Sequence, residues 1–174
     1  MKRLVTLHLV VALALSLCAT LAAQAAPPRA TAAEVDLSVN GIQFGSTYEQ
    51  IVQKIGRTRK QEREQVRDDT CGPPYMDLGL TYDGLFIRLK GTPKETAFKA
   101  VSFDVTSAKW MIQPGIRVGM ADADVRKVVG EPSSTDKFEG TVVEHFVNKG
   151  DNGIANLFVK NGKLVRVAWE VKLC

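Results

Sequence analysis

Two segments of the chain follow one pattern, and this repeat constrains the fold more than any other feature of the sequence. The first segment, GIQFGSTYEQIVQKIG, runs from Gly41 to Gly56, and the second, GIRVGMADADVRKVVG, runs from Gly115 to Gly130. They align without a gap, and three glycines and one isoleucine are identical. A repeat of this kind indicates two copies of one supersecondary unit.

Each copy predicts a short extended piece followed by a helix. Ile42 and Phe44 alternate with polar neighbours, which is typical of a strand. The run from Ser46 to Glu49 resembles a capping box, in which a polar N-cap residue is followed three positions later by glutamate. In the second copy, Asp122 and Asp124 favour a helix start through the helix dipole. The last glycine of each copy predicts the helix end.

Strand-like runs with apolar alternation follow each helix. They cover Leu78–Tyr82, Leu85–Leu89 and Ala100–Val105 after the first, and Val142–Val147, Ala155–Val159 and Leu164–Leu173 after the second. Asn161-Gly162 predicts a type I′ hairpin turn before the last run. We therefore expect an α+β fold of two tandem helix-then-antiparallel-sheet units, residues 37–106 and 107–174, with the helices on one face of the sheet.

Two further expectations concern local structure. Strict alternation in the last run places Val165, Val167 and Trp169 on one face of the sheet and Arg166, Ala168 and Glu170 on the other. The copies differ most in residues 57–74, RTRKQEREQVRDDTCGPP, which mix basic and acidic side chains. We expect an ordered surface loop there, with a helical extension ending before Asp68 as the alternative.

The N-terminal residues predict a secretory signal peptide. Lys2 and Arg3 precede an apolar run, and Ala23-Gln24-Ala25 fits a cleavage site. We expect a signal peptide over residues 1–25, a flexible segment over 26–36, and a periplasmic or secreted protein. Lipidation at Cys18 is disfavoured, because Leu17 stands where a small residue is needed. No later apolar run is long enough for stable membrane insertion.

The cysteines that remain after cleavage predict a disulfide. They are Cys71 and Cys174, an even number in an exported chain, and their bridge would close a loop of about 100 residues. Metal binding by two lone thiols is the weaker alternative, because no histidine or further cysteine stands nearby at ligand spacing. Redox catalysis is also disfavoured, since the chain has no Cys-x-x-Cys motif.

Charge and motif content exclude several functional classes. The net charge of +4 falls to about +2 without Lys2 and Arg3, which is too weak to indicate nucleic acid or a membrane surface as partner. His145 is the only histidine after loss of the signal peptide, and no Gly-x-Ser-x-Gly motif is present. Asp122 and Asp124 would point apart on a helix, so they do not predict a metal site. We expect a protein that is not an enzyme and has no cofactor.

The best candidate site is the open face of the predicted sheet. If the aliphatic residues of GLFIRLK and NLFVKNG face the helices, Phe86 and Phe158 project from the other face beside Arg88 and Lys160. His145 could join them there. Aromatic and basic side chains on a polar sheet face are typical of a protein-binding hot spot. The alternative is that both phenylalanines are covered by residues 57–74 or by the other unit.

The second copy together with LFVKNGKLVRV resembles an exported helix-then-sheet family. This SmpA/OmlA-type family includes the outer-membrane assembly lipoprotein BamE and the tandem-repeat beta-lactamase inhibitor protein BLIP. The shared pattern is G-[IV]-x-x-G-M, a helix, G-x-P, a strand, N-G and a closing strand; the first copy departs from it at Ser46, at Arg57-Thr58 and in the insert.

The resemblance implies a protein-binding role without catalysis. We expect inhibition or neutralisation of a partner protein, as by an inhibitor or an immunity protein. Two alternatives remain open: an envelope assembly or maintenance factor, and a small-ligand-binding protein.

Overall fold

Alternating apolar residues build one large sheet from both halves of the chain. The computed structural model describes residues 34–66, 74–92, 97–149 and 153–171. The expected signal peptide and the expected disulfide partners Cys71 and Cys174 lie outside these residues. The elements are β1 (Glu34–Val35), β2 (Ser38–Val39), α1 (Tyr48–Ile55), β3 (Lys60–Val66), β4 (Tyr75–Tyr82), β5 (Leu85–Gly91), β6 (Lys99–Val105), β7 (Ile112–Gln113), α2 (Asp122–Val129), β8 (Ser134–Phe138), β9 (Thr141–Asn148), β10 (Gly153–Lys160) and β11 (Lys163–Glu170).

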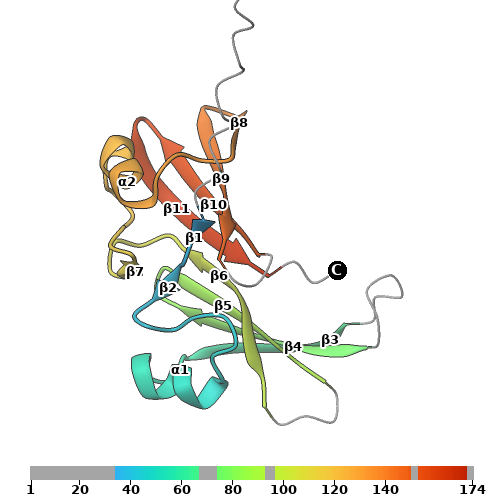
Figure 1. The fold of residues 1–174 in the computed structure, drawn as a ribbon. Helices are drawn as coiled ribbons and strands as arrows, with labels where there is room; N and C mark the ends of the chain where they lie inside the picture. The colour runs from blue at the N-terminus through green and yellow to red at the C-terminus, as the bar shows by residue number, and fades with distance from the viewer. Residues whose placement is uncertain (1–33, 67–73, 93–96, 150–152, 172–174) are drawn as a thin grey trace, which may run out of the picture. The chain divides into compact units, whose positions relative to one another are not determined.

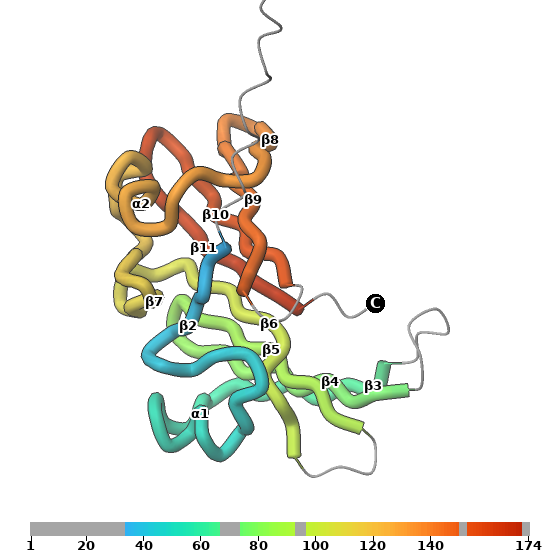
Figure 2. Tube along the Cα trace, viewed as in Figure 1, coloured from blue at the N-terminus to red at the C-terminus, as the bar shows by residue number. Residues whose placement is uncertain are grey.

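The strand order shows how the two halves meet. The large sheet has the strand order β1-β9-β10-β11-β6-β5-β4-β3 (Figures 1 and 2). Strand β1 pairs with β9 in parallel, and β8 pairs with β9 in antiparallel. The halves join where β11 pairs antiparallel with β6, from Val167 opposite Val105 to Glu170 opposite Ser102. We call this junction the seam. A separate two-stranded sheet pairs β2 with β7.

The expected fold class is wrong. The described chain is mostly strand in one mixed sheet, and it is not two helix-and-sheet units with helices covering one face. Each helix has only eight residues and buries one or two of them fully, Ile51 in α1 and Val125 with Val129 in α2. An apolar stripe this narrow is too small to form a layer over eight strands in a row. The division into units 37–106 and 107–174 stays a prediction.

The two glycine-bounded segments nevertheless make matching backbone contacts. Gly45 N–H donates to the carbonyl oxygen of Ala100 at 2.9 Å, and Gly119 N–H donates to that of Leu164 at 2.7 Å. Both glycines have positive φ, of 77° and 96°, which explains why glycine stands at each position. Each segment therefore turns the chain onto one strand of the sheet and starts a helix there.

The cap of α1 lies one residue later than the sequence pattern predicts. Thr47 is the N-cap, and its hydroxyl oxygen accepts a bond from the backbone N–H of Gln50 at 3.3 Å. The Gln50 side chain returns the contact by accepting from the Thr47 N–H at 2.8 Å. The capping box thus uses Thr47 and Gln50 in place of Ser46 and Glu49.

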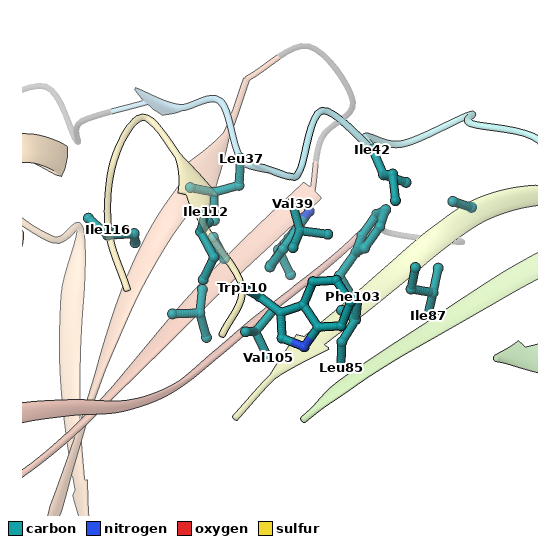
Figure 3. Close-up of a cluster of buried hydrophobic side chains, with 14 of the residues drawn as sticks. Leu37, Val39, Ile42, Leu85, Ile87, Phe103, Val105, Trp110, Ile112 and Ile116 are labelled. Atoms are coloured by element: carbon teal, nitrogen blue, oxygen red, sulfur yellow. The ribbon is translucent and has the colours of Figure 1, made fainter. Parts of the chain in front are cut away.

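A second layer, made of the small β2–β7 sheet and the chain beside it, covers the inner face of the large sheet at the seam. Figure 3 shows Leu37, Val39 and Ile42 from the N-terminal segment, with Trp110 and Ile112, above the strands β5 and β6. The Phe103 and Trp169 rings stack across the seam with centroids 4.7 Å apart. The indole N–H of Trp110 donates to the carbonyl oxygen of Asp83 at 2.8 Å. The core is therefore continuous across both halves.

Part of the charged insert is a strand, and the expectation of a loop is wrong there. Residues 60–66 form β3, which pairs along its whole length with β4. On the inner face of the sheet, β3 contributes Arg63, whose guanidinium lies 4.8 Å from the centre of the Phe98 ring. Charged side chains on an edge strand oppose pairing with other chains.

Among the described residues, no helix is long and apolar enough to cross a membrane.

An open sheet face as the candidate functional site

Strand register places the five predicted site residues on one face of the sheet. Directly opposite residues of neighbouring antiparallel strands share a face. The row that starts at Phe86 on β5 continues through Asp104, Ala168 and Asn156 to His145 on β9. Arg88 lies two residues from Phe86, and Phe158 and Lys160 lie at even spacing from Asn156. We call this surface the open face.

The aliphatic residues that alternate with this set point inward, as the sequence predicts. Leu85, Ile87 and Leu89 in β5 and Leu157 in β10 are fully buried. Phe86, in contrast, is 36% exposed, and Phe158 is half-buried. The alternative that residues 57–74 cover both phenylalanines fails for residues 60–66, because these form the edge strand β3.

A hollow of about 410 Å³ lies on the open face over the seam. All residues that line it belong to the four central strands β5, β6, β11 and β10. They are Phe86, Arg88, Ser102, Phe103, Asp104, Asn156, Phe158, Arg166, Ala168, Trp169 and Glu170. Three of the predicted residues, Phe86, Arg88 and Phe158, therefore meet at one place. His145 and Lys160 lie on the same face beyond the rim of the hollow.

Two ion pairs cross the seam beside the hollow. Arg166 donates from Nε and Nη2 to the two carboxylate oxygens of Asp104, at 2.8 and 2.7 Å. Its guanidinium also lies 4.6 Å from the centre of the Phe158 ring. Arg88 donates from Nη2 to Glu170 at the longer distance of 3.4 Å. The first pair is bidentate and stacked on a ring, so Arg166 is held more firmly than Arg88.

The Phe86 ring packs over Gly79 on the neighbouring strand β4, where no side chain stands in its way. A Cβ at Gly79 would lie 3.0 Å from Cε2 of the Phe86 ring. The ring therefore lies across the glycine, an arrangement known to stabilise glycine in sheets. Next to it, burial raises the pKa of Asp77, although Arg88 and Lys90 oppose the shift.

His145 is oriented by hydrogen bonds from both sides. Its Nδ1 lies 2.7 Å from the Asn156 side-chain oxygen, and its Nε2 lies 3.0 Å from Asp136 on β8. Asn156 also lines the hollow, so His145 fixes the side chain of a lining residue. This contact supports a positioning role for His145.

Sequence reasoning missed most of the polar lining. Ser102, Asp104 and Asn156 follow from strand alternation once the β6–β11 pairing is known, but that pairing has no local sequence signal. The face of Val165 was predicted wrongly, because the β10–β11 register shifts by one residue there and Leu164 is buried instead. Arg166, Ala168 and Glu170 do share the open face as predicted.

The largest exposed apolar side chains also gather on this face. Val147 and Ile154 lie opposite each other on β9 and β10 and are 42% and 44% exposed. Phe138 on β8 is 70% exposed. These exposed apolar side chains therefore lie on the same face of the sheet as the charged residues of the hollow.

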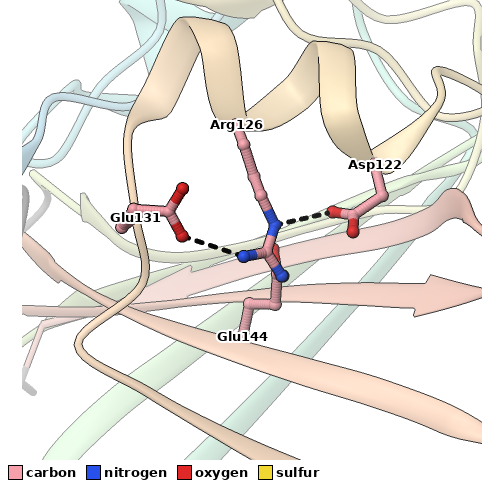
Figure 4. A network of polar contacts seen from close by, with 4 residues as sticks. All are labelled: Asp122, Arg126, Glu131 and Glu144. Carbon is pink, nitrogen blue, oxygen red and sulfur yellow. Dashed lines mark hydrogen bonds and ion pairs between the residues drawn. The ribbon is translucent and has the colours of Figure 1, made fainter.

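A buried carboxylate forms a second polar cluster, under α2 on the opposite face. Glu144 on β9 is fully buried and pairs with Arg126, which also contacts Asp122 at 3.4 Å and Glu131 at 2.9 Å (Figure 4). The second carboxylate oxygen of Glu144 has no hydrogen-bond partner within the described ranges. Burial raises the pKa of Glu144 and Asp122 adds to the shift, while Arg126 opposes it. In the described part of the chain, no group of three or more metal-ligating side chains comes together.

The raised pKa of Glu144 predicts a pH-dependent contribution to stability. A buried acid with a raised pKa stabilises the native state most below its ordinary pKa, near 4.5, and this stability is lost as pH rises through the native pKa. The unfolding free energy of Glu144→Gln, relative to wild type, should therefore increase as pH rises from 4.5 to 8. Urea unfolding at several pH values measures this difference, and a constant or decreasing difference would contradict the assignment.

Comparisons with known proteins show no family. No protein-family model and no curated protein matches the sequence. Two solved structures are similar at a TM-score of 0.44: an extracellular protein containing an SCP domain from Bacillus anthracis, 15% identical, and a cysteine-rich secretory protein from Staphylococcus aureus, 16% identical. Each likeness covers 74% of this chain and 44% of the other protein, so the chain spans less than half their length.

A third solved structure is a candidate beta-lactamase inhibitor protein from Streptococcus mutans. It is 17% identical, with a TM-score of 0.28 over 72% of this chain and 83% of that protein. Likenesses at these scores carry no argument about function, which has to come from the geometry of the open face.

Proposed function

We propose that the protein is a non-enzymatic protein-binding module that acts outside the cytoplasm and inhibits or neutralises a partner protein. The observation that carries this proposal is the open face, where Phe86, Phe158 and the exposed pair Val147 and Ile154 share one surface with arginines. Aromatic and arginine side chains are enriched at the centres of protein interfaces, where a few residues carry most of the binding energy. Arg166 stacked on Phe158 has this composition within a single contact.

The layout of the sheet supports a rigid binding surface. The site residues lie on central strands, and residues from 35 to 42 and from 110 to 116 support the opposite face. Side chains on paired strands lose little freedom on binding, which favours affinity. Export through the expected signal peptide would bring this surface to partners in the envelope or outside the cell.

Capture from the cell envelope tests the proposal. Purified protein should retain one partner, and Phe86→Ala/Phe158→Ala should reduce its recovery at least 10-fold, because the two rings flank the hollow. Val128→Ala is the matched control, since Val128 is 41% exposed but lies on α2, and it should capture the partner like wild type.

A second arm separates binding from inhibition. The captured partner's own activity should fall when wild-type protein is added and should recover with the double variant. A double variant that keeps its circular dichroism spectrum and still captures the partner would contradict a role for the open face. A partner whose activity is unchanged would favour the envelope assembly role over inhibition.

A further inference from the structure

The polar side chains around the hollow differ in how many hydrogen bonds they make within the protein. Both carboxylate oxygens of Asp104 already accept bonds from Arg166. Arg88, in contrast, makes a single hydrogen bond within the described residues, from Nη2 to Glu170 at 3.4 Å. A guanidinium carries five N–H donors. Most of the donors of Arg88 therefore have no partner among the described residues.

Two neutral donors lie in the same lining. Ser102 stands directly opposite Arg88 across β5 and β6, and its hydroxyl makes no hydrogen bond to any described residue. The oxygen of the Asn156 side chain lies 2.7 Å from His145, which leaves the amide NH₂ without a described partner. Three side chains of the lining thus present unengaged donors, and a ligand group that bonds to all three is an acceptor. Unengaged acceptors are also present, among them the second carboxylate oxygen of Glu170.

The surroundings favour a charged acceptor. Phe86 and Phe158 line the hollow beside these donors, and a partner pressed against both rings would exclude water. Charge-assisted hydrogen bonds strengthen when water is excluded. The Arg88 side chain is only 33% exposed, whereas Glu170 is 54% exposed, so Arg88 is the better desolvated of the pair. Its planar fork matches a carboxylate bidentately.

We propose that the hollow receives an aspartate or glutamate side chain from a protruding loop of the partner protein, with Arg88 as the main donor and an apolar neighbour of that acid packed against Phe86 or Phe158. This inference rests on the proposed function and names the chemistry of the partner. Glu170 competes with the incoming carboxylate for Arg88.

A displayed library of random 12-residue loops supplies the probe. Loops selected on wild-type protein and depleted on Phe86→Ala/Phe158→Ala retain only binders of the open face. We expect these binders to carry an acid beside an aromatic or aliphatic residue. Their Kd should rise at least 10-fold with Arg88→Gln and stay unchanged with Arg117→Gln, an exposed arginine outside the hollow.

Two further variants make the test specific. Glu170→Gln should tighten binding several-fold by removing the competitor, whereas a cationic loop residue would bind more weakly to the same variant. Changing the loop acid to its amide should weaken binding to wild type but add nothing with Arg88→Gln, because the two groups are coupled.

The outcomes separate the two proposals. Face-dependent binders without an acid, or binders insensitive to Arg88→Gln, would overturn this inference and leave the protein-binding function standing. No face-dependent binder at all, together with envelope capture that ignores the double variant, would overturn both.

Discussion

Arg126→Ala is expected to destabilise the protein by about 3–5 kcal/mol, because it leaves the carboxylate of Glu144 buried and uncompensated. Glu144 is fully buried, and Arg126 is its only hydrogen-bond partner among the described residues. Burial acts to lower the pKa of Arg126, but Glu144 and Asp122 outweigh it and raise the pKa. The guanidinium therefore stays charged and holds α2 to β9. Urea unfolding at pH 7 measures the loss.

A double variant and a surface control define the cause. Arg126→Ala/Glu144→Leu should regain much of the lost stability, since the fully buried charge is then removed and only the partly exposed Asp122 and the exposed Glu131 remain. Lys127→Ala removes the neighbouring cation of α2, which pairs with Asp124 at 2.7 Å but is 75% exposed. It should cost less than about 1 kcal/mol. Equal losses in the Arg126 and Lys127 variants would show that Glu144 is not the reason.

Trp169→Ala is the second large effect, with an expected loss of about 3–5 kcal/mol. Trp169 is 1% exposed and stacks on Phe103 across the seam, so its removal leaves a cavity in the core. Its indole N–H has no hydrogen-bond partner in the part of the chain that the structure describes. Trp169→Phe keeps an aromatic ring and removes that unpaired donor, so it should lose clearly less than the alanine variant.

The stacking contact can be isolated with a double-mutant cycle. Trp169→Leu and Phe103→Leu should be coupled by about 0.5–1.5 kcal/mol if the rings interact as a pair. Val165→Ala is the control on the same strand, because Val165 is 38% exposed at the register shift. Coupling near zero, or a control as damaging as Trp169→Ala, would place the stability of the seam elsewhere.

The strands predicted from apolar alternation after each helix are present, whereas strands without it were missed. The short extended pieces expected at Ile42 and Ile116 are wrong, because each of these residues forms only an isolated bridge. β5 and β10 alternate strongly, and their inward residues follow the pattern. Strand β3 has an almost wholly polar sequence, so its pairing with β4 is decided by backbone hydrogen bonds and by the Arg63–Phe98 contact. Strand β8 is exposed throughout and likewise carries no apolar signal.

The candidate site was predictable one strand at a time. Phe86, Arg88 and Phe158 lie together because each occupies the outward phase of its own strand. Their mutual distance depends on the pairing of β6 with β11, which joins parts of the chain that share no local pattern. The fold class was predicted wrongly for the same reason. The repeat can be recognised in the local sequence, but the joining of both halves into one sheet cannot.

The pairing of β1 with β9 has a consequence for the order of folding. The backbone N–H of Leu37 donates to the side chain of Asn148, 111 residues later, so the start of the sheet waits for a strand near its end. Contacts of such high sequence separation slow folding. The first strand of the described chain therefore finds its place in the sheet only after most of the other strands have been synthesised.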